Sequence, residues 1–192
     1  MQNHHTKRLF IAASILADLS LKTLVEKLRH SLSYERINWV KPDNMHLTFK
    51  FLGNTPQDKI LPITRELQSV ANHHKPIAYY LNKCGIFGSK YNPRVIWLGA
   101  DSHPESIISL ATDIIDSMHK LGFERDRQNF VPHLTIGRIK LLSDKHRFQQ
   151  LIQSIEQADY QQLQLNEFRL YESVLKPTGP EYTIIERFPL TK

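Results

Sequence analysis

The chain has 192 residues, 41% of them apolar and 23% charged, with a formal net charge of +6. This composition supplies enough apolar side chains for a sizeable core and excludes a disordered or fibrous protein, while the single cysteine, Cys84, excludes an internal disulfide and a thiolate metal cage. No apolar run reaches the roughly 18 residues of a transmembrane helix, and the first residues lack the apolar segment of a secretory signal, so we expect a cytoplasmic protein without a membrane span.

Apolar periodicity predicts alternating strands and helices in the first half of the chain. Leu21, Leu24, Val25 and Leu28 recur at i, i+3, i+4 and i+7, the stripe of an amphipathic helix. The predicted elements are a buried strand at 8–14, this helix at 21–28, a short strand at 37–40, a strand at 46–52 closed by Gly53-Asn54, and a helix at 60–70.

The second half repeats this order. It contains a predicted strand at 95–99, a helix at 107–118, a strand at 130–138, a helix at 148–155, and closing strands at 167–173 and 182–188. A shift of 87 residues lays 9–13 on 96–100 and the first helical stripe on the third. We therefore predict an α+β fold in which residues 1–192 form one bilobal domain, with two similar lobes facing each other across a cleft.

The same shift superimposes two copies of a His-x-Thr motif. The motifs are His46-Leu47-Thr48 and His133-Leu134-Thr135, and each lies on a predicted strand. With the residue that follows the threonine, they span 46–49 and 133–136. One copy would be a weak signal, whereas two copies at the same place in a repeat are hard to obtain by chance. On a strand, the histidine and the threonine leave the same face, about 6.6 Å apart at roughly 3.3 Å per residue.

Two such strands facing each other would place two imidazoles and two hydroxyls around one phosphate-sized volume. A neutral and a protonated histidine supply a general base and a general acid near neutral pH. The threonine hydroxyls can donate to phosphoryl oxygens, on which negative charge develops in the transition state. This scheme needs no metal.

Two other interpretations of the motifs stay open. The histidine and threonine of each motif could simply be exposed polar residues of an amphipathic strand. Such residues are common, so this interpretation suits one motif better than two. The histidines could also bind a metal, but the chain has no His-Glu-x-x-His motif. Asp43, the nearest acid to His46, lies in Pro42-Asp43-Asn44, a sequence typical of a turn.

Several segments closely resemble the RNA 2′,3′-cyclic phosphodiesterases, also called 2′-5′ RNA ligases, of the two-histidine phosphoesterase superfamily. The resemblance extends from Arg8 to Leu190. It rests on the segments at 8–12, 38–53, 93–97, 130–138, 170–173 and 187–190.

The resemblance implies a bilobal α+β fold whose antiparallel sheets line a central cleft, with helices outside. It implies hydrolysis of a terminal 2′,3′-cyclic phosphate to a 2′-phosphate and a 3′-hydroxyl. We expect this reaction to use neither a cofactor nor a metal. By this analogy His46 is the proton donor and His133 the proton acceptor, and Thr48, Thr135 and Arg138 bind the phosphate. The expected partner is an RNA end, such as that of a tRNA half, or a small cyclic nucleotide, bound by a monomer. The residues alone do not distinguish the two histidine roles.

Arg138 does not fit strict alternation, which places it on the face opposite His133. A bulge near Gly137, where the family often has Ala, would bring it to the cleft; otherwise it is a surface charge.

Three further residues are candidates for RNA contact. Trp39 and Tyr171 could stack on a base, although packing is the commoner role of such residues. Lys50 shares the predicted face of His46, so it could attract the RNA backbone or be simply solvated. Phe49 and Phe51, on the Leu47 face, are expected in the core.

Two alternative functions remain. A ligase would join RNA halves through a 2′-5′ bond, with a 5′-hydroxyl in the place of water. A non-catalytic RNA-binding module is disfavoured by the two complete motifs and by basic residues that are scattered without clustered aromatics.

Overall fold

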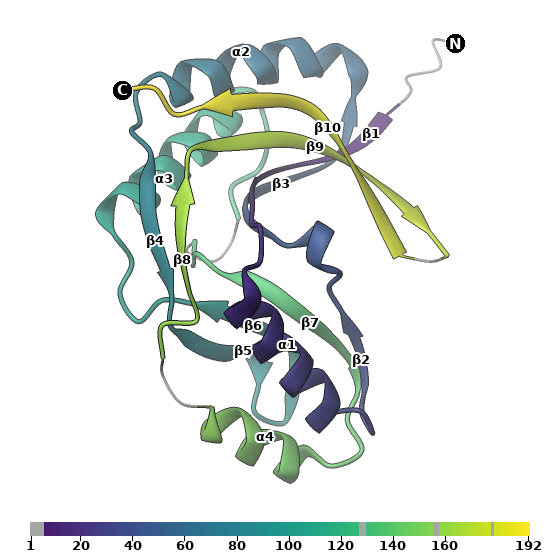
Figure 1. The fold of residues 1–192 in the computed structure, drawn as a ribbon. Helices are drawn as coiled ribbons and strands as arrows, with labels where there is room; N and C mark the ends of the chain where they lie inside the picture. Colours follow the sequence, from purple (N-terminus) through teal and green to yellow (C-terminus); the bar gives the residue numbers. More distant parts are fainter. Residues whose placement is uncertain (1–5, 127–129, 156–157, 178) are drawn as a thin grey trace.

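The computed structural model describes residues 6–126, 130–155, 158–177 and 179–192. Its main sheet has eight antiparallel strands in the order β10-β9-β1-β3-β7-β6-β5, with β2 beside β7, and β4 and β8 form a separate ribbon (Figure 1). The strands are β1 (Thr6–Ser14), β2 (Arg36–Trp39), β3 (His46–Pro56), β4 (Ile77–Leu81), β5 (Lys83–Ser89), β6 (Asn92–Gly99), β7 (Leu134–Leu141), β8 (Gln161–Leu165), β9 (Glu167–Lys176) and β10 (Gly179–Pro189). The helices are α1 (Leu19–Ser31), α2 (Ile60–Ala71), α3 (Glu105–Lys120) and α4 (Lys145–Ser154), with 3-10 turns η1 (Pro42–Asn44) and η2 (Gln57–Lys59).

The fold is bilobal, as expected. The first lobe contains β10, β9, β1 and β3, and the second contains β2, β7, β6 and β5. The two lobes are joined in the sheet through the antiparallel pair of Leu47 in β3 and Leu134 in β7. We expected two antiparallel sheets, but the strands of both lobes form one continuous sheet. A single residue pair joins its two halves at the centre.

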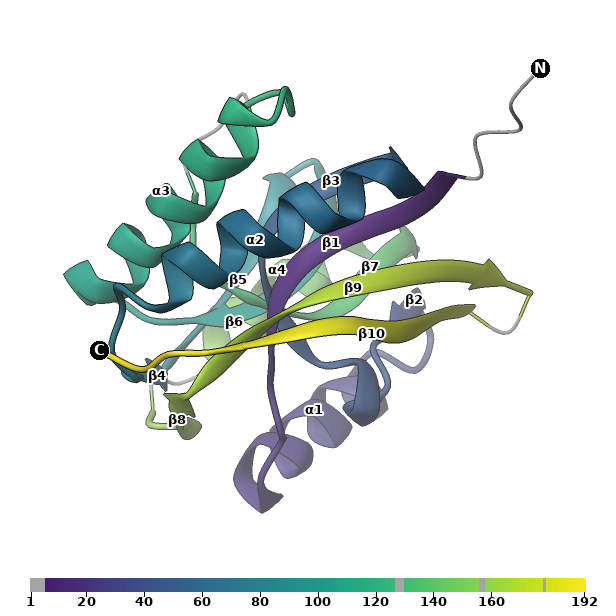
Figure 2. The same ribbon diagram turned by 90° about the horizontal axis from the view of Figure 1, so that it is seen from above.

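Helices cover each lobe and two of them are exchanged between lobes (Figures 1 and 2). α2 and α3 pack together beside the first lobe, and α3 contacts β3. α1 and α4 lie beside the second lobe, where Val25 of α1 and Ile37 of β2 line a common pocket. Because α1 follows β1 and α3 follows β6, each half of the sequence gives a helix to the other lobe, which interlocks the two halves.

The helix α1 shows how local sequence sets these elements. The Asp18 side chain accepts a hydrogen bond from the backbone N–H of Leu21 at 2.9 Å, which caps the first turn. Of the predicted stripe, Leu21, Val25 and Leu28 are buried and Leu24 is half-buried. Asp144 caps α4 in the same way, by accepting from the N–H of Arg147 at 2.9 Å.

Some predicted bounds were wrong. The strand predicted at 130–138 begins only at Leu134 and continues to Leu141. β3 does not close at Gly53 but passes through it, with a φ of 69° that suits glycine, and ends at Pro56. The strands β4, β5 and β8 were not predicted.

A β-bulge in β3 inverts the alternation after Thr48. Ala12 of β1 pairs with Thr48, but its neighbour Ile11 pairs with Lys50, so Phe49 is an extra residue. One extra residue exchanges the faces of the residues that follow, here as far as a second register shift at Leu52. Phe51, expected in the core, is accordingly 57% exposed, whereas Lys50 is only 3% exposed.

Among the described residues, no helix combines the length and the apolar character needed to cross a bilayer.

Candidate active site

The two His-x-Thr motifs lie side by side at the junction of the lobes. The antiparallel pairing of Leu47 with Leu134 places Thr135 opposite His46 and His133 opposite Thr48. Both leucines are fully buried, so the histidines and threonines leave the other face of the sheet, where all four are partly exposed. Residues diagonal to each other across an antiparallel pair are typically about 7–8 Å apart. His46 and His133 stand in that diagonal relation, a spacing that admits a phosphate between their rings.

Both imidazoles are oriented by the same backbone contact. The Nδ1 of His46 lies 2.6 Å from the carbonyl oxygen of Asn44, and the Nδ1 of His133 lies 2.7 Å from that of Val131. A carbonyl oxygen only accepts, so each Nδ1 carries a hydrogen and donates it. Each Nε2 is then left to accept a proton in the neutral ring or to donate one in the charged ring.

The surroundings favour the neutral form of both rings. Burial lowers the pKa of His46 below 6.5, against the opposing effect of its hydrogen bond to Asn44, and the charges of Arg138 and His133 lower it further. Burial also lowers the pKa of His133, again against its backbone hydrogen bond, with a further contribution from Arg138. The charge of Arg138 thus lowers the pKa of both rings. An anion bound beside them would raise both pKa values.

Arg138 reaches this face because β7 contains a bulge. Ile96 of β6 pairs with Gly137, whereas the next residue, Trp97, pairs with Thr135, so Ile136 is the extra residue. The alternation therefore reverses between Thr135 and Arg138. Arg138 lines the same pocket as His46 and Thr135.

Aromatic side chains support each histidine. The His46 ring lies 5.1 Å from the Phe10 ring and meets Tyr182 edge-on at 5.3 Å. The His133 ring meets Phe87 edge-on at 4.6 Å, and Phe87 stacks on Trp97 at 5.3 Å. These contacts contribute to the burial that lowers the pKa of both histidines.

A pocket of about 530 Å³ opens beside His46 between the second lobe and the hairpin of β9 and β10. The amide of Asn44 donates to the carbonyl of Pro180 at 3.2 Å, which holds the hairpin tip against the turn that precedes His46. His133 and Thr48 do not line this pocket, because they lie on the other side of the Leu47–Leu134 pair. Its lining residues are Asn38, Trp39, Val40, Lys41, Asn44, His46, Thr135, Arg138, Lys176, Pro177, Gly179, Pro180 and Tyr182.

Two of the three predicted RNA contacts need correction. Lys50 lies in the interior, where its ammonium donates to the Glu124 carbonyl at 2.6 Å and pairs with Asp126 at 2.9 Å. The bulge at Phe49 turned it away from the His46 face. Tyr171 is 7% exposed and stacks on Phe10 at 5.0 Å, so its ring is occupied by packing. Trp39 lines the pocket and stays a candidate for stacking.

Tyr79 is a supporting residue that the sequence did not indicate. It is fully buried in β4, and its hydroxyl donates to the carbonyl of Pro132 at 3.1 Å, directly before His133. Burial raises its pKa to about 12. The sequence also did not indicate Phe10, Phe87 and Tyr182. The contacts of all four residues join segments that are distant in the sequence.

Within the described residues, no three His, Cys, Asp or Glu side chains gather as a metal site would require. Independence from metal remains a prediction for experiment.

Gly85 offers a test of the wall behind His133. A Cβ at Gly85 would lie 2.3 Å from the Trp97 indole, so Gly85→Ala must displace Trp97 and, through it, Phe87. We expect Gly85→Ala to lower the free energy of unfolding by roughly 1–3 kcal/mol, the usual cost of overpacking. Urea unfolding monitored by tryptophan fluorescence measures this.

Gly137→Ala is the matched control, because its Cβ would meet Ile37 at 3.0 Å and needs only a small adjustment. An equal or smaller loss in Gly85→Ala than in Gly137→Ala would contradict the packing described for Trp97.

Comparison with known proteins places the chain among phosphoesterases. The sequence profile of the LigT like Phosphoesterase family matches residues 17–97 and residues 98–182. The chain belongs to this family. The RNA 2′,3′-cyclic phosphodiesterase of Methanocaldococcus jannaschii is 30% identical to this LigT-like phosphoesterase over 181 residues, which cover 94% of this chain and 99% of that protein.

Solved structures share the fold of this LigT-like phosphoesterase. The crystal structure of TT0787 from Thermus thermophilus has a TM-score of 0.78 at 24% identity and covers 95% of this chain and 97% of that one. Escherichia coli LigT complexed with 3′-AMP has a TM-score of 0.71 at 23% identity, with coverage of 98% and 99%. At these identities the likeness concerns the fold alone.

Proposed function

We propose that this LigT-like phosphoesterase hydrolyses the 2′,3′-cyclic phosphate at an RNA end to a 2′-phosphate and a 3′-hydroxyl. The observation that carries the proposal is the pairing of Leu47 with Leu134, which sets His46 and His133 on one face of the sheet with both Nε2 atoms available. The name of the Methanocaldococcus jannaschii relative supports this substrate.

In this mechanism the phosphate lies between the two rings. The Nε2 of His133 takes a proton from the attacking water, and the Nε2–H of His46 gives a proton to the departing 3′-oxygen. The new bond joins the water oxygen to phosphorus and the broken bond is that to the 3′-oxygen, so the phosphate stays on the 2′-oxygen. This assignment of donor and acceptor follows the family resemblance.

Thr48, Thr135 and Arg138 complete the site in this proposal. The hydroxyls of Thr48 and Thr135 donate to the non-bridging oxygens, and Arg138 offsets the charge that grows on them. The Nδ1 bonds to Asn44 and Val131 hold each ring at the required angle while the Nε2 atoms exchange protons. Trp39 and Tyr182 line the adjoining pocket, where a nucleoside would fit. We propose action by a monomer, without metal, in the cytoplasm, on RNA ends such as tRNA halves or on small cyclic nucleotides.

The direct experiment offers a short oligonucleotide ending in a 2′,3′-cyclic phosphate to the enzyme in EDTA and identifies the product isomer. A 2′-phosphate with a 3′-hydroxyl is the expected product. A 3′-phosphate would reverse the leaving group, and activity that required added zinc or magnesium would overturn the metal-free mechanism.

The lowered histidine pKa values predict an acidic optimum. Activity requires one ring charged and the other neutral, so kcat/KM should be bell-shaped and centred between the two apparent pKa values of the free enzyme. Both lie below 6.5. The proton donor is lost as pH rises, so kcat/KM should peak below pH 6.5 and fall up to about tenfold per pH unit above it.

Initial rates on a 2′,3′-cyclic mononucleotide from pH 5 to 8 test this, with circular dichroism to check folding at each pH. A maximum at or above pH 7, or a flat profile, would contradict the described electrostatics.

A further inference from the structure

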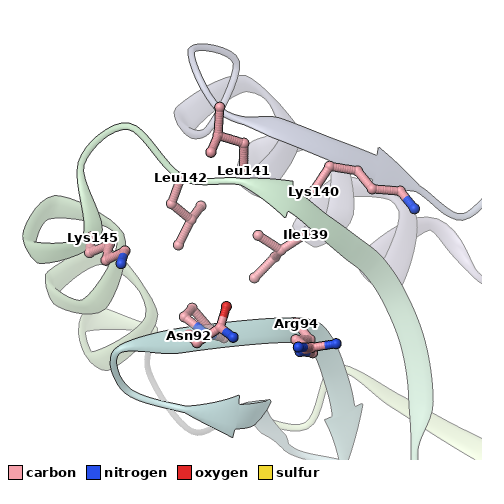
Figure 3. A pocket seen from close by; sticks show the side chains of 8 residues that line it. Asn92, Arg94, Ile139, Lys140, Leu141, Leu142 and Lys145 are labelled. Carbon is pink, nitrogen blue, oxygen red and sulfur yellow. The ribbon is translucent and has the colours of Figure 1, made fainter.

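A second cationic pocket lies at the far end of β6 and β7, where the two strands separate. The last pair between them is Val95 with Arg138, yet β6 begins at Asn92 and β7 continues to Leu141. The gap between these strand ends and the start of α4 encloses about 460 Å³ (Figure 3). We call it the fork pocket; its lining residues are Asn92, Pro93, Arg94, Ile139, Lys140, Leu141, Leu142 and Lys145.

The fork pocket concentrates positive charge. Arg94, Lys140 and Lys145 come from three different elements, all are exposed, and the lining contains no carboxylate. None of the three forms an ion pair with another described residue. Arg94 and Lys145 lie at two sides of the cavity, where both charges would attract an anion, and Lys140 adds positive charge at its rim (Figure 3).

The nearby acids are already engaged by the backbone. Glu35, which is 8% exposed, accepts from the N–H groups of Ser143 and Asp144 at 2.6 and 2.9 Å. Asp144 accepts from the N–H of Arg147. These bonds fix the loop before α4 and engage the N–H groups of Ser143, Asp144 and Arg147. The arginine and lysine side chains are the charged groups that line the pocket.

The fork pocket lies farther along β7 than the active site. Arg138 lines the site beside His46, and Lys140 lines the fork pocket two residues later, about 6.6 Å away at roughly 3.3 Å per residue. Ile139 points into the fork pocket, whereas the side chain of Lys140 leads away from it (Figure 3). A chain of negative charges that starts at the histidines and follows β7 therefore meets cations at both ends of this short path.

From this arrangement we infer that the fork pocket binds a backbone phosphate of the RNA strand that leads to the cyclic end. The inference rests on the proposed function and adds to it a preference for RNA over cyclic mononucleotides, which are too short to reach Arg94 and Lys145. The contacts are exposed and charged, so they contribute affinity that salt weakens, without sequence readout.

The test compares two substrates in one double variant. Arg94→Gln with Lys145→Gln should raise KM about tenfold for an oligonucleotide ending in a 2′,3′-cyclic phosphate. The slope of log(kcat/KM) against log salt concentration should become shallower by about 0.7 for each phosphate of the single strand that the variant no longer neutralises. Turnover of a 2′,3′-cyclic mononucleotide should stay within about twofold of the wild type.

The matched control removes the same charges from the other lobe. Arg65 on α2 and Lys75 after it are exposed and form none of the ion pairs found among described residues. Arg65→Gln with Lys75→Gln should leave both substrates unaffected. An equal rise in KM in the control variant, or equal losses on both substrates in the Arg94/Lys145 variant, would overturn the inference.

Binding assays separate this inference from the proposed function. Fluorescence anisotropy with a labelled oligonucleotide ending in a 3′-hydroxyl requires no turnover, and the Arg94/Lys145 variant should bind it about tenfold more weakly. Unchanged affinity would reject the fork pocket even if hydrolysis is intact, and weakened affinity would uphold it even if hydrolysis is absent. Inorganic phosphate is the second probe: calorimetric binding that disappears in the variant while oligonucleotide affinity is unchanged would assign the pocket to a small free anion instead.

Discussion

Replacing His46 or His133 by alanine is expected to lower kcat by roughly 10²–10⁴, the usual contribution of general acid–base catalysis. The His46 ring contacts Phe10 and Tyr182, and the His133 ring contacts Phe87. These three aromatic residues remain in the alanine variants, so we expect the variants to fold. Steady-state rates on a cyclic mononucleotide measure the loss. The double variant should lose little more than the worse single variant, because the two rings act in one step.

His73→Ala is the control for these substitutions. The Nδ1 of His73 also contacts a backbone carbonyl, that of Ser69 at 2.7 Å, but this ring is exposed at the end of α2. Normal activity is expected for His73→Ala. Near-normal turnover in His46→Ala or His133→Ala would remove the mechanism.

The same variants can assign the two roles. A substrate with sulfur in place of the 3′-bridging oxygen has a leaving group that departs without a proton. His46→Ala should recover most of its activity on this substrate, whereas His133→Ala should not, because water must still lose its proton. Recovery of His133→Ala instead would exchange the two roles and leave the site intact.

Replacing Arg138 by methionine is expected to have two effects, which a purely structural role would not produce together. Loss of its charge should lower kcat/KM by roughly 10²-fold, the size of effect seen when one donor to a developing oxyanion is removed. It should also move the pH optimum upward, because the positive charge of Arg138 lowers the pKa of both His46 and His133. The pH profile of kcat/KM measures both effects at once.

Lys140→Met is the control for Arg138, since it removes a charge two residues farther along β7. On a cyclic mononucleotide, neither its rate nor its optimum should differ from the wild type. A lower rate in Arg138→Met with an unchanged optimum would mean that Arg138 does not act on the two rings as described.

The centre of the site was predictable because it depends on a short-range property. Two residues that alternate on a strand share a face whatever the rest of the fold is. His46 with Thr48 and His133 with Thr135 follow this rule, and the buried partner of each pair is the leucine between them. The offset of 87 residues indicated that the motifs belong together, and the repeat itself stays a prediction.

The surroundings of the site were not predictable, because they depend on pairing between distant strands. The bulges at Phe49 and Ile136 exist only relative to β1 and β6. The first buried Lys50 and exposed Phe51, contrary to the alternation, and the second turned Arg138 into the pocket. The short strands β4, β5 and β8 escaped prediction because they are too short, or in β5 too rich in glycine, for a clear period.

Titration of the two imidazoles by NMR tests most directly whether they share one phosphate. With ¹³C-labelled histidine and inorganic phosphate as ligand, the pKa values of His46 and His133 should rise together, with one dissociation constant, while the His73 resonances should not respond to phosphate. A rise at only one of the two rings, or rises with unrelated dissociation constants, would contradict the shared site.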